Sequence, residues 1–171
     1  SQAAYFLNPV RDHLKSQGYF FEIQGRQSLR LKVREALEAW RTLQRGQPIT
    51  YDLAKVLYSY MTGNGVRVAR GYKKILGEED DTFTFEELRD TNGLLATLDM
   101  SWNEALDKVP GVDVAYVNAL VRRGEDLTAP PRIKLSTIHG AKGGEADNVV
   151  LFTDLTVAAE RSMDADPDSM H

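Results

Sequence analysis

The stretch Arg132–Phe152, RIKLSTIHGAKGGEADNVVLF, combines three patterns that decide the fold. Its first part, IKLSTI, alternates apolar and polar residues as a half-buried strand does, and its last part, NVVLF, is a continuous apolar run typical of a strand covered on both faces. Between them lies a turn that contains Gly140, Gly143 and Gly144. A strand, a glycine-rich turn and a second strand predict α/β structure with a loop at a strand end.

This glycine-rich turn is not one of the common phosphate-binding loops. In the P-loop pattern GxxxxGK[ST] the lysine and the hydroxyl follow the glycines and reach the terminal phosphates and the metal. Here Lys142 precedes Gly143 and Gly144, and neither GK[ST] nor the dinucleotide pattern GxGxxG occurs in the chain. The KGG variant of partition-type ATPases also needs the missing GK[ST]. We therefore expect no ATP-cradling loop within these residues.

The stretch does resemble a motif in the second RecA-like domain of superfamily-1 helicases of the UvrD/Rep type. That motif is a strand, then Thr-x-His-x-Ala-Lys-Gly-x-Glu, then an apolar strand. The matching residues are Thr137, His139, Ala141, Lys142, Gly143 and Glu145. The resemblance implies an ATP-dependent DNA helicase or translocase with 3′-to-5′ polarity. ATP and Mg²⁺ would be the cofactors of the full-length parent protein.

The same resemblance assigns roles to the residues of the turn. It implies that Thr137 and His139 lie along single-stranded DNA and that Glu145 accepts hydrogen bonds from the nucleotide ribose. A hydroxyl and an imidazole donate to phosphate oxygens without reading bases, as a motor that moves over any sequence requires. Lys142 is assigned to the DNA, with an ion pair to Glu145 or Asp147 as the open alternative.

The two glycines after Lys142 belong to the nucleotide side of the prediction. Gly143 and Gly144 let the backbone approach a phosphate or ribose closely and adopt positive φ. The chain departs from the family at Gly144, where a leucine is usual, and at Ala146, where an aromatic residue is frequent. The turn therefore lacks two apolar anchors.

The rest of the chain indicates a helical stretch inserted into the α/β structure. Helical spacing is present over Leu7–Gln17, a short aromatic and β-branched run follows at residues 19–23, and helices dominate from Leu31 to Thr128. The segment LNPVRDHLKSQGYFFEIQGRQSLRLKVREALEAWRTL is similar to the one after the fourth motif of the family. The predicted fold class is α/β, an incomplete RecA-like parallel-sheet domain interrupted by a mostly α-helical insertion.

The predicted domain organisation follows from these segments. Residues 1–30 would form the first part of the second RecA-like domain, residues 31–129 the helical insertion domain, and residues 130–171 the second part with the TIHGAKGGE motif. The P-loop domain and the YVGVTRA-like motif of the family are absent from these residues. We therefore interpret the chain as a piece of a larger helicase, inactive as an ATPase by itself and partnered by single-stranded DNA and the N-terminal RecA-like domain.

Local signals place several helix ends and core positions. Thr84 with Glu87 and Ser101 with Glu104 have the spacing of capping boxes. A last helix is predicted over residues 112–123, ending at Gly124, with four residues on its inward side: Val114, Val117, Leu120 and Val121. The two tryptophans, Trp40 and Trp102, would stack on bases in a single-strand channel, but both stand at core-type helical positions, and we expect them in the core.

Charge is unevenly distributed along the chain. Residues 1–74 contain 13 Lys and Arg against 5 Asp and Glu, whereas residues 75–171 contain 8 against 20. Either solvated helix faces of opposite sign attract one another, or a basic surface meets a polyanion. One basic cluster, interpreted as a phosphate-facing patch or as the polar side of a short helix, consists of Arg67, Arg70, Lys73 and Lys74. The helix side is the favoured interpretation.

Composition also sets limits on metal sites and on cellular location. The chain has no cysteine, and its three histidines, His13, His139 and His171, are scattered, so neither disulfides nor a zinc site is predicted. No apolar run has the length of a membrane span, and the N-terminal residues lack the layout of a signal peptide. We expect a cytoplasmic protein without a membrane partner.

Three other functions remain as alternatives to the helicase interpretation. In the first alternative, the chain is a non-enzymatic RecA-like module that binds DNA or a protein. An adjoining P-loop domain in the full gene would exclude this alternative. In the second alternative, the chain is part of the motor of a helicase-nuclease. A nuclease motif downstream in the complete reading frame would support this alternative. A stand-alone nucleotide-binding protein is disfavoured because the chain has no complete phosphate loop.

Overall fold

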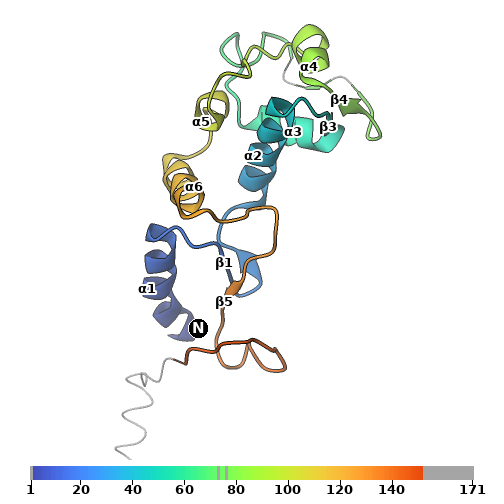
Figure 1. Ribbon diagram of the computed structural model, residues 1–171. Helices are drawn as coiled ribbons and strands as arrows, with labels where there is room; N and C mark the ends of the chain where they lie inside the picture. The colour runs from blue at the N-terminus through green and yellow to red at the C-terminus, as the bar shows by residue number, and fades with distance from the viewer. Residues whose placement is uncertain (1, 73, 76, 152–171) are drawn as a thin grey trace, which may run out of the picture. The chain divides into compact units, whose positions relative to one another are not determined.

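The computed structural model describes residues 2–72, 74–75 and 77–151 (Figure 1). Lys73, Phe152 and the acidic tail that ends at His171 therefore lie outside the described residues. The chain forms two compact units, Ser1–Gly140 and Ala141–His171. The elements, all in the first unit, are α1 (Gln2–Ser16), β1 (Phe21–Ile23), β2 (Arg26–Gln27), α2 (Leu31–Gln44), β3 (Ile49–Thr50), α3 (Tyr51–Ser59), β4 (Thr82–Phe83), α4 (Phe85–Thr91), α5 (Trp102–Ala105), α6 (Gly111–Arg123) and β5 (Ile133–Leu135).

A small mixed sheet joins the two strands that flank the helical stretch. Its order is β2-β1-β5, with β1 antiparallel to β2 and parallel to β5. Phe21 pairs with Ile133, and Ile23 pairs with Leu135. The chain is therefore a mixed α/β structure, as predicted, and the strands predicted at 19–23 and 133–138 are present in shortened form as β1 and β5. The division into domains stays a prediction.

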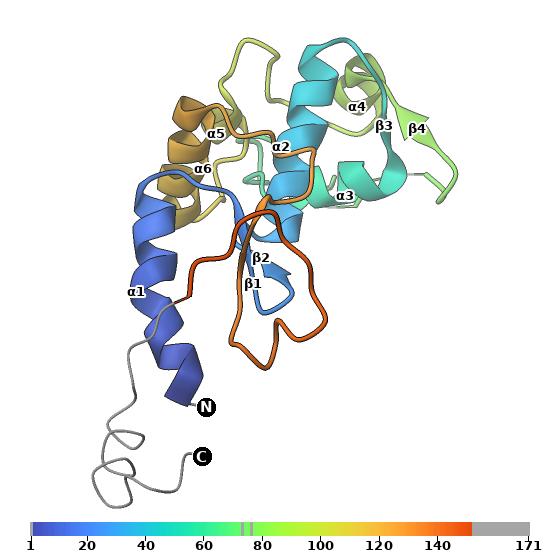
Figure 2. The ribbon, with the colours of Figure 1, turned by 60° about the horizontal axis from the view of Figure 1, so that its bottom comes forward.

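Helix α2 runs through the centre of the core. Figures 1 and 2 show the sheet at one end of α2 and α4 toward the other, and α3 packs against α2. Trp40 on α2 is completely buried, and its indole Nε1 donates a hydrogen bond to the carbonyl of Met100 over 3.3 Å. Trp102 is half-buried and packs against the same core. The core position predicted for the tryptophans is confirmed.

The two predicted capping boxes are present and begin α4 and α5. At α4, the Thr84 amide donates to the Glu87 carboxylate over 2.8 Å, and the Glu87 amide donates to the Thr84 hydroxyl over 3.2 Å. At α5, the Ser101 amide donates to the Glu104 carboxylate over 2.8 Å. These bonds satisfy amide groups that the first turn of a helix leaves unpaired.

Helix α6 ends at Gly124, as predicted, with φ of 80° in the left-handed region. Its inward face is centred on Asp113, Tyr116, Val117 and Leu120, all buried. The prediction that Val121 faces inward is wrong, because that side chain lies at the edge of this face and is 46% exposed. Val114 packs against the core in half-buried form.

Tyr116 ties α6 to the residues around β1. Its hydroxyl donates to the carbonyl of Tyr19 over 2.6 Å and lies 2.7 Å from the Ser28 hydroxyl, which accepts the Phe21 amide. Burial raises the pKa of the Tyr116 phenol to about 12. Close to this network, Gly18 has φ of 72°, and a Cβ there would collide with the carbonyl of Ala119 on α6. Only glycine fits this approach of α1 to α6.

Two predicted elements are not formed. The favoured helix around Arg67 is wrong, because its described residues form turns: the amide of Ala69 donates to Gly93, the amide of Leu95 donates to Arg67, and Gly71 has φ of 88°. The strand predicted at 148–152 is also wrong over its described residues 148–151, which are irregular and exposed. A strand needs a neighbour for its backbone groups, and none pairs with 148–151 within the described residues.

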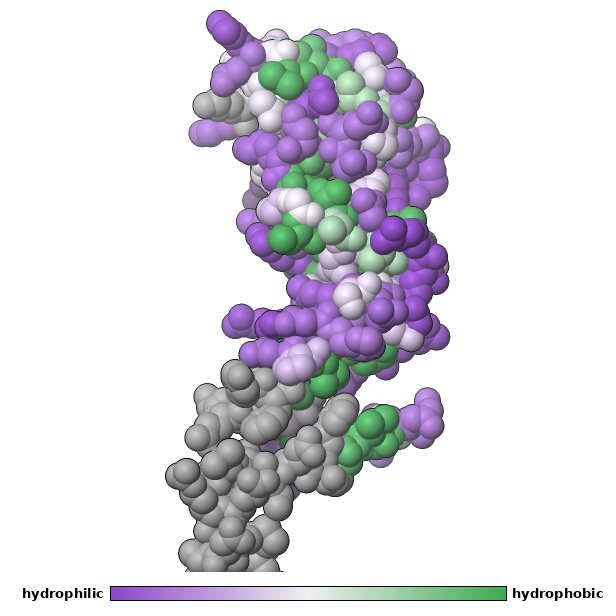
Figure 3. Space-filling model, turned by 90° about the vertical axis from the view of Figure 1, so that its left-hand side faces the viewer, coloured by the Kyte–Doolittle hydropathy of each residue, from purple (hydrophilic) through white to green (hydrophobic). Residues whose placement is uncertain are grey.

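The face shown in Figure 3 is mostly hydrophilic, and its hydrophobic residues form small separate patches. Single exposed apolar side chains such as Val112 on α6 are ordinary in folded proteins. Among the described residues, no helix is long and apolar enough to cross a membrane.

Candidate functional site

The TIHGAKGGE motif begins at Thr137, one residue beyond the end of β5 at Leu135. The amide of Gln24 donates to the carbonyl of Leu135 over 3.1 Å, so the β1–β5 pairing continues to the last residue of β5. Because β1 and β5 are parallel, their carboxyl ends lie at the same edge of the sheet. Thr137 and His139 follow at this edge, the position at which open α/β sheets place ligand-binding loops.

The first half of the motif is a short turn held by Thr137. The Thr137 hydroxyl oxygen accepts a hydrogen bond from the Gly140 amide over 3.2 Å, which leaves the hydroxyl hydrogen for another acceptor. A Cβ at Gly140 would lie 2.5 Å from the Ser136 hydroxyl oxygen, so a larger residue here requires the Ser136 side chain to turn away. The side chain of His139 is exposed and that of Thr137 is half-buried.

The second half of the motif belongs to the second compact unit, because the boundary falls between Gly140 and Ala141. Gly143 has φ of 78°, and the Gly144 amide donates to the carbonyl of Ala141 over 2.9 Å. Lys142 and Glu145 are exposed. The structure thus forms a separate turn in each half of the motif.

The alternative in which Lys142 pairs with a nearby acid is not observed. Within the described residues, Lys142 forms no ion pair with Glu145 or Asp147. The lysine and both carboxylates are therefore available to solvent or to a ligand. Also within the part of the chain that the structure describes, no three His, Cys, Asp or Glu side chains group together as metal ligands do.

A hollow lies at the same edge of the sheet as the first turn. It has a volume of about 430 Å³, and its lining includes Ile23 at the end of β1 and Gln24 after it. Arg11 and Arg26 supply positive charge to the lining, although Arg11 Nε pairs with Asp12 over 2.8 Å. Sequence reasoning missed this pair of arginines because they belong to different elements, α1 and β2.

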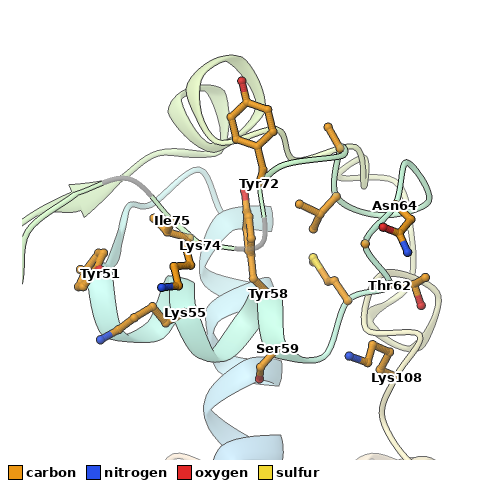
Figure 4. Close-up of a pocket in the computed structure, with 14 residues that line it drawn as sticks. Tyr51, Lys55, Tyr58, Ser59, Thr62, Asn64, Tyr72, Lys74, Ile75 and Lys108 are labelled. Carbon is orange, nitrogen blue, oxygen red and sulfur yellow. The ribbon is translucent and has the colours of Figure 1, made fainter.

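A larger groove lies in the helical part of the first unit. Its volume is about 880 Å³, and the described residues that line it belong to α3 and to the loop after it, or are Lys108 (Figure 4). The lining contains three tyrosines and three lysines, namely Tyr51, Lys55, Tyr58, Tyr72, Lys74 and Lys108. Sequence reasoning singled out Lys74 but missed the groove, because the tyrosines meet the lysines only through tertiary packing.

No family model, curated protein or solved structure matches the chain. The interpretation of these sites therefore depends on their own geometry and on the motif.

Proposed function

We propose that this chain is part of an ATP-dependent DNA helicase or translocase of the UvrD/Rep type and contributes most of a RecA-like domain with a helical insertion. The observation that carries the proposal is the position of the motif. Thr137 and His139 stand at the carboxyl end of the parallel strand β5, with the imidazole exposed and the threonine hydroxyl hydrogen available. Strand ends of this kind face ligands in α/β proteins.

The proposed DNA contacts are made with the sugar-phosphate backbone. The Thr137 hydroxyl and the His139 imidazole donate to phosphate oxygens, and Lys142 adds a positive charge. Arg26, in the hollow at the same sheet edge as Thr137, forms no ion pair among the described residues and would add to the attraction. Such contacts do not read base sequence, so a motor that uses them moves over any DNA.

The proposed nucleotide contact is made by Gly143, Gly144 and Glu145. The positive φ of Gly143 turns the backbone tightly, and the exposed Glu145 carboxylate has free acceptor positions for ribose hydroxyls. An acceptor carboxylate at this position fits a ribose, whose hydroxyls donate, but not a triphosphate, which a carboxylate repels. The phosphates of ATP and the Mg²⁺ ion would be held by the N-terminal RecA-like domain of the parent protein.

The DNA contact is tested by fluorescence anisotropy with a labelled single-stranded oligonucleotide at low and moderate salt. The double variant Thr137→Ala/His139→Ala is expected to bind roughly fivefold to tenfold more weakly, the size expected for two lost hydrogen bonds. The matched control is Thr91→Ala/His13→Ala, which removes the same groups from exposed positions on α4 and α1. Equal affinity of the double variant and the unchanged chain would contradict the proposed DNA contact.

The chain alone is expected to show no DNA-stimulated ATP hydrolysis, because it has no GK[ST] loop for the phosphates. A coupled assay of phosphate release with and without oligonucleotide measures this. Turnover that persists through repeated purification would show that the phosphate-binding group lies within these residues.

A further inference from the structure

The walls of the groove in the helical part of the first unit are joined to neighbouring segments by hydrogen bonds. The loop at 61–75 is fixed on one side by the Thr62 amide, which donates to the Asp107 carboxylate over 2.8 Å. The Lys108 amide donates to the carbonyl of Tyr60 over 3.0 Å, and the Ala69 amide donates to the carbonyl of Gly93 over 2.8 Å. Its volume of about 880 Å³ is in the range of ligand pockets.

The charge of the groove is positive and not neutralised within its lining. Among the described residues, the lining includes three lysines and no acid. Lys55 is partly neutralised from outside, since its ammonium lies 2.7 Å from the Asp52 carboxylate, while Lys74 and Lys108 are exposed and form no ion pair among the described residues. In Figure 4, Lys55 and Lys74 stand on one side of Tyr58 and Lys108 stands on the other.

The acid nearest Lys108 in sequence does not cancel its charge. Asp107 accepts the Thr62 amide with one carboxylate oxygen, and the other lies 3.9 Å from Arg67 Nε. The positive charge of Lys108 therefore remains available to a ligand. A groove with two such ammonium groups attracts an anion.

The apolar part of the lining is aromatic. The Tyr58 hydroxyl is buried and donates to the carbonyl of Asn92 over 2.9 Å, so its ring forms part of the groove wall. Tyr72 is 36% exposed, and its ring packs against Gly93, where a Cβ would lie 2.7 Å from the ring. Tyr72 thus offers a supported aromatic surface to the groove.

We propose that this groove binds a segment of single-stranded nucleic acid, with phosphates at Lys74 and Lys108 and a base against the ring of Tyr72. Aromatic platforms beside positive charge are the usual means of binding single strands without sequence preference. An acidic peptide has the charge but lacks flat bases for the tyrosine. The inference goes beyond the proposed function, which places DNA at Thr137, His139 and Lys142, and adds a second contact in the helical stretch.

The test uses the full chain and fluorescein-labelled oligothymidylate in anisotropy titrations over a range of salt. The variant Lys74→Gln/Lys108→Gln is expected to bind about tenfold more weakly at low salt. The slope of log affinity against log salt should fall by about 1.4, because each phosphate contact to a single strand contributes about 0.7. The control Lys32→Gln/Arg122→Gln removes two exposed charges elsewhere and should leave the slope nearly unchanged. Equal losses in the two double variants would overturn the proposal.

The base contact is tested with Tyr72→Ala and with an oligonucleotide that lacks bases. Tyr72→Ala should weaken binding of oligothymidylate by about fivefold or more and should have little effect on the abasic strand. Cross-linking with 5-iodouracil and mass spectrometry should place an adduct on Tyr72. An adduct only at other residues, or oligoglutamate that competes as well as oligothymidylate, would overturn the assignment to nucleic acid.

These outcomes separate the groove from the proposed helicase contact. Loss of binding in the groove variant alone supports the groove and contradicts the contact at Thr137 and His139. Loss in Thr137→Ala/His139→Ala alone supports that contact and overturns the groove. Undetectable binding by the unchanged chain at low salt overturns the groove as a site that works within these residues.

Discussion

The helical stretch and the glycine-rich segment differ in the exposure of their apolar residues, which are mostly buried in the first and exposed in the second. In the helical stretch, side chains such as Trp40, Leu57 and Leu120 are completely buried. In the segment at 141–151, Val149 and Val150 are 79% and 80% exposed. Both regions have apolar residues in regular patterns, so pattern alone does not determine burial.

The difference shows what each pattern needs. A helix satisfies its backbone hydrogen bonds within itself, so the stripe around Trp40 requires only another helix to cover it. A strand satisfies its backbone groups only with a neighbouring strand. Residues 148–151 have the composition of a covered strand, and no neighbouring strand exists for them in the described part of the chain. Core stability should therefore come from the helical stretch.

The largest expected effect on stability is that of Trp40→Ala. The indole is fully buried and donates to the Met100 carbonyl, so its removal leaves a cavity and takes away one of the two donors to this carbonyl, the other being Gln44 Nε2 at 3.1 Å. The free energy of unfolding should fall by about 3 to 5 kcal/mol. Urea denaturation followed by far-ultraviolet circular dichroism measures this.

The matched control for Trp40 is Trp102→Ala, because Trp102 is only half-buried. Its loss should be clearly smaller than that of Trp40→Ala. If the two variants unfold at the same urea concentration, the burial of a tryptophan does not determine how much it stabilises the helical stretch.

A smaller effect is expected for Tyr116→Phe, which keeps the ring but removes the hydroxyl that joins Tyr19 and Ser28. The free energy of unfolding should fall by about 1 to 2 kcal/mol, because the Tyr19 carbonyl loses its donor. Thermal and urea denaturation at neutral pH measure the loss. A variant as stable as the unchanged chain would show that this network contributes nothing to the joint between α6 and the sheet.

The same variant tests a pH dependence. Burial raises the pKa of Tyr116 from 10.0 to about 12, so the folded state favours the neutral phenol. Its contribution to stability is complete below pH 10 and is lost as the pH rises to about 12. Tyr116→Phe should lose less stability over this interval. Burial also raises the pKa of Tyr58, so the stability of Tyr116→Phe should still fall somewhat as the pH rises through this interval.

Much of the fold follows from local signals in the sequence. The capping boxes at Thr84 and Ser101 and the helix end at Gly124 were predicted because hydrogen bonds within a few residues determine them. The sequence predicts α/β structure but not the parallel pairing of β1 with β5, because the register of that pairing depends on residues far apart in sequence. Tyr116 was missed because its partners, Tyr19 and Ser28, are distant in the chain.

The candidate sites divide in the same way. The turn at Thr137 was predicted because its residues are consecutive and form a motif. The groove was missed because its lining combines Tyr51, Tyr72 and Lys108 from separate segments. The helix favoured around Arg67 was wrong because charge spacing alone does not indicate a helix, and Gly71 adopts a left-handed conformation there.

A third variant, Thr84→Ala, sharpens the comparison within the helical stretch. It removes one half of the capping box at the start of α4, and the free energy of unfolding should fall by about 1 kcal/mol. The control is Thr91→Ala at the exposed last residue of α4, where no cap is lost. Equal denaturation midpoints for the two variants would mean that the cap does not stabilise the helical stretch.

The smallest effect is expected for Val149→Asp in the glycine-rich segment. An aspartate in a core costs several kcal/mol because its charge leaves water, but the Val149 side chain is already in water. The free energy of unfolding should change by less than about 0.5 kcal/mol. Val117→Asp, at a buried position on α6, provides the contrast. This variant should be strongly destabilised and unfold at a much lower urea concentration than the unchanged chain. A large loss in Val149→Asp would show that the residue is covered when the chain is in solution, so that the two regions bury their apolar residues alike.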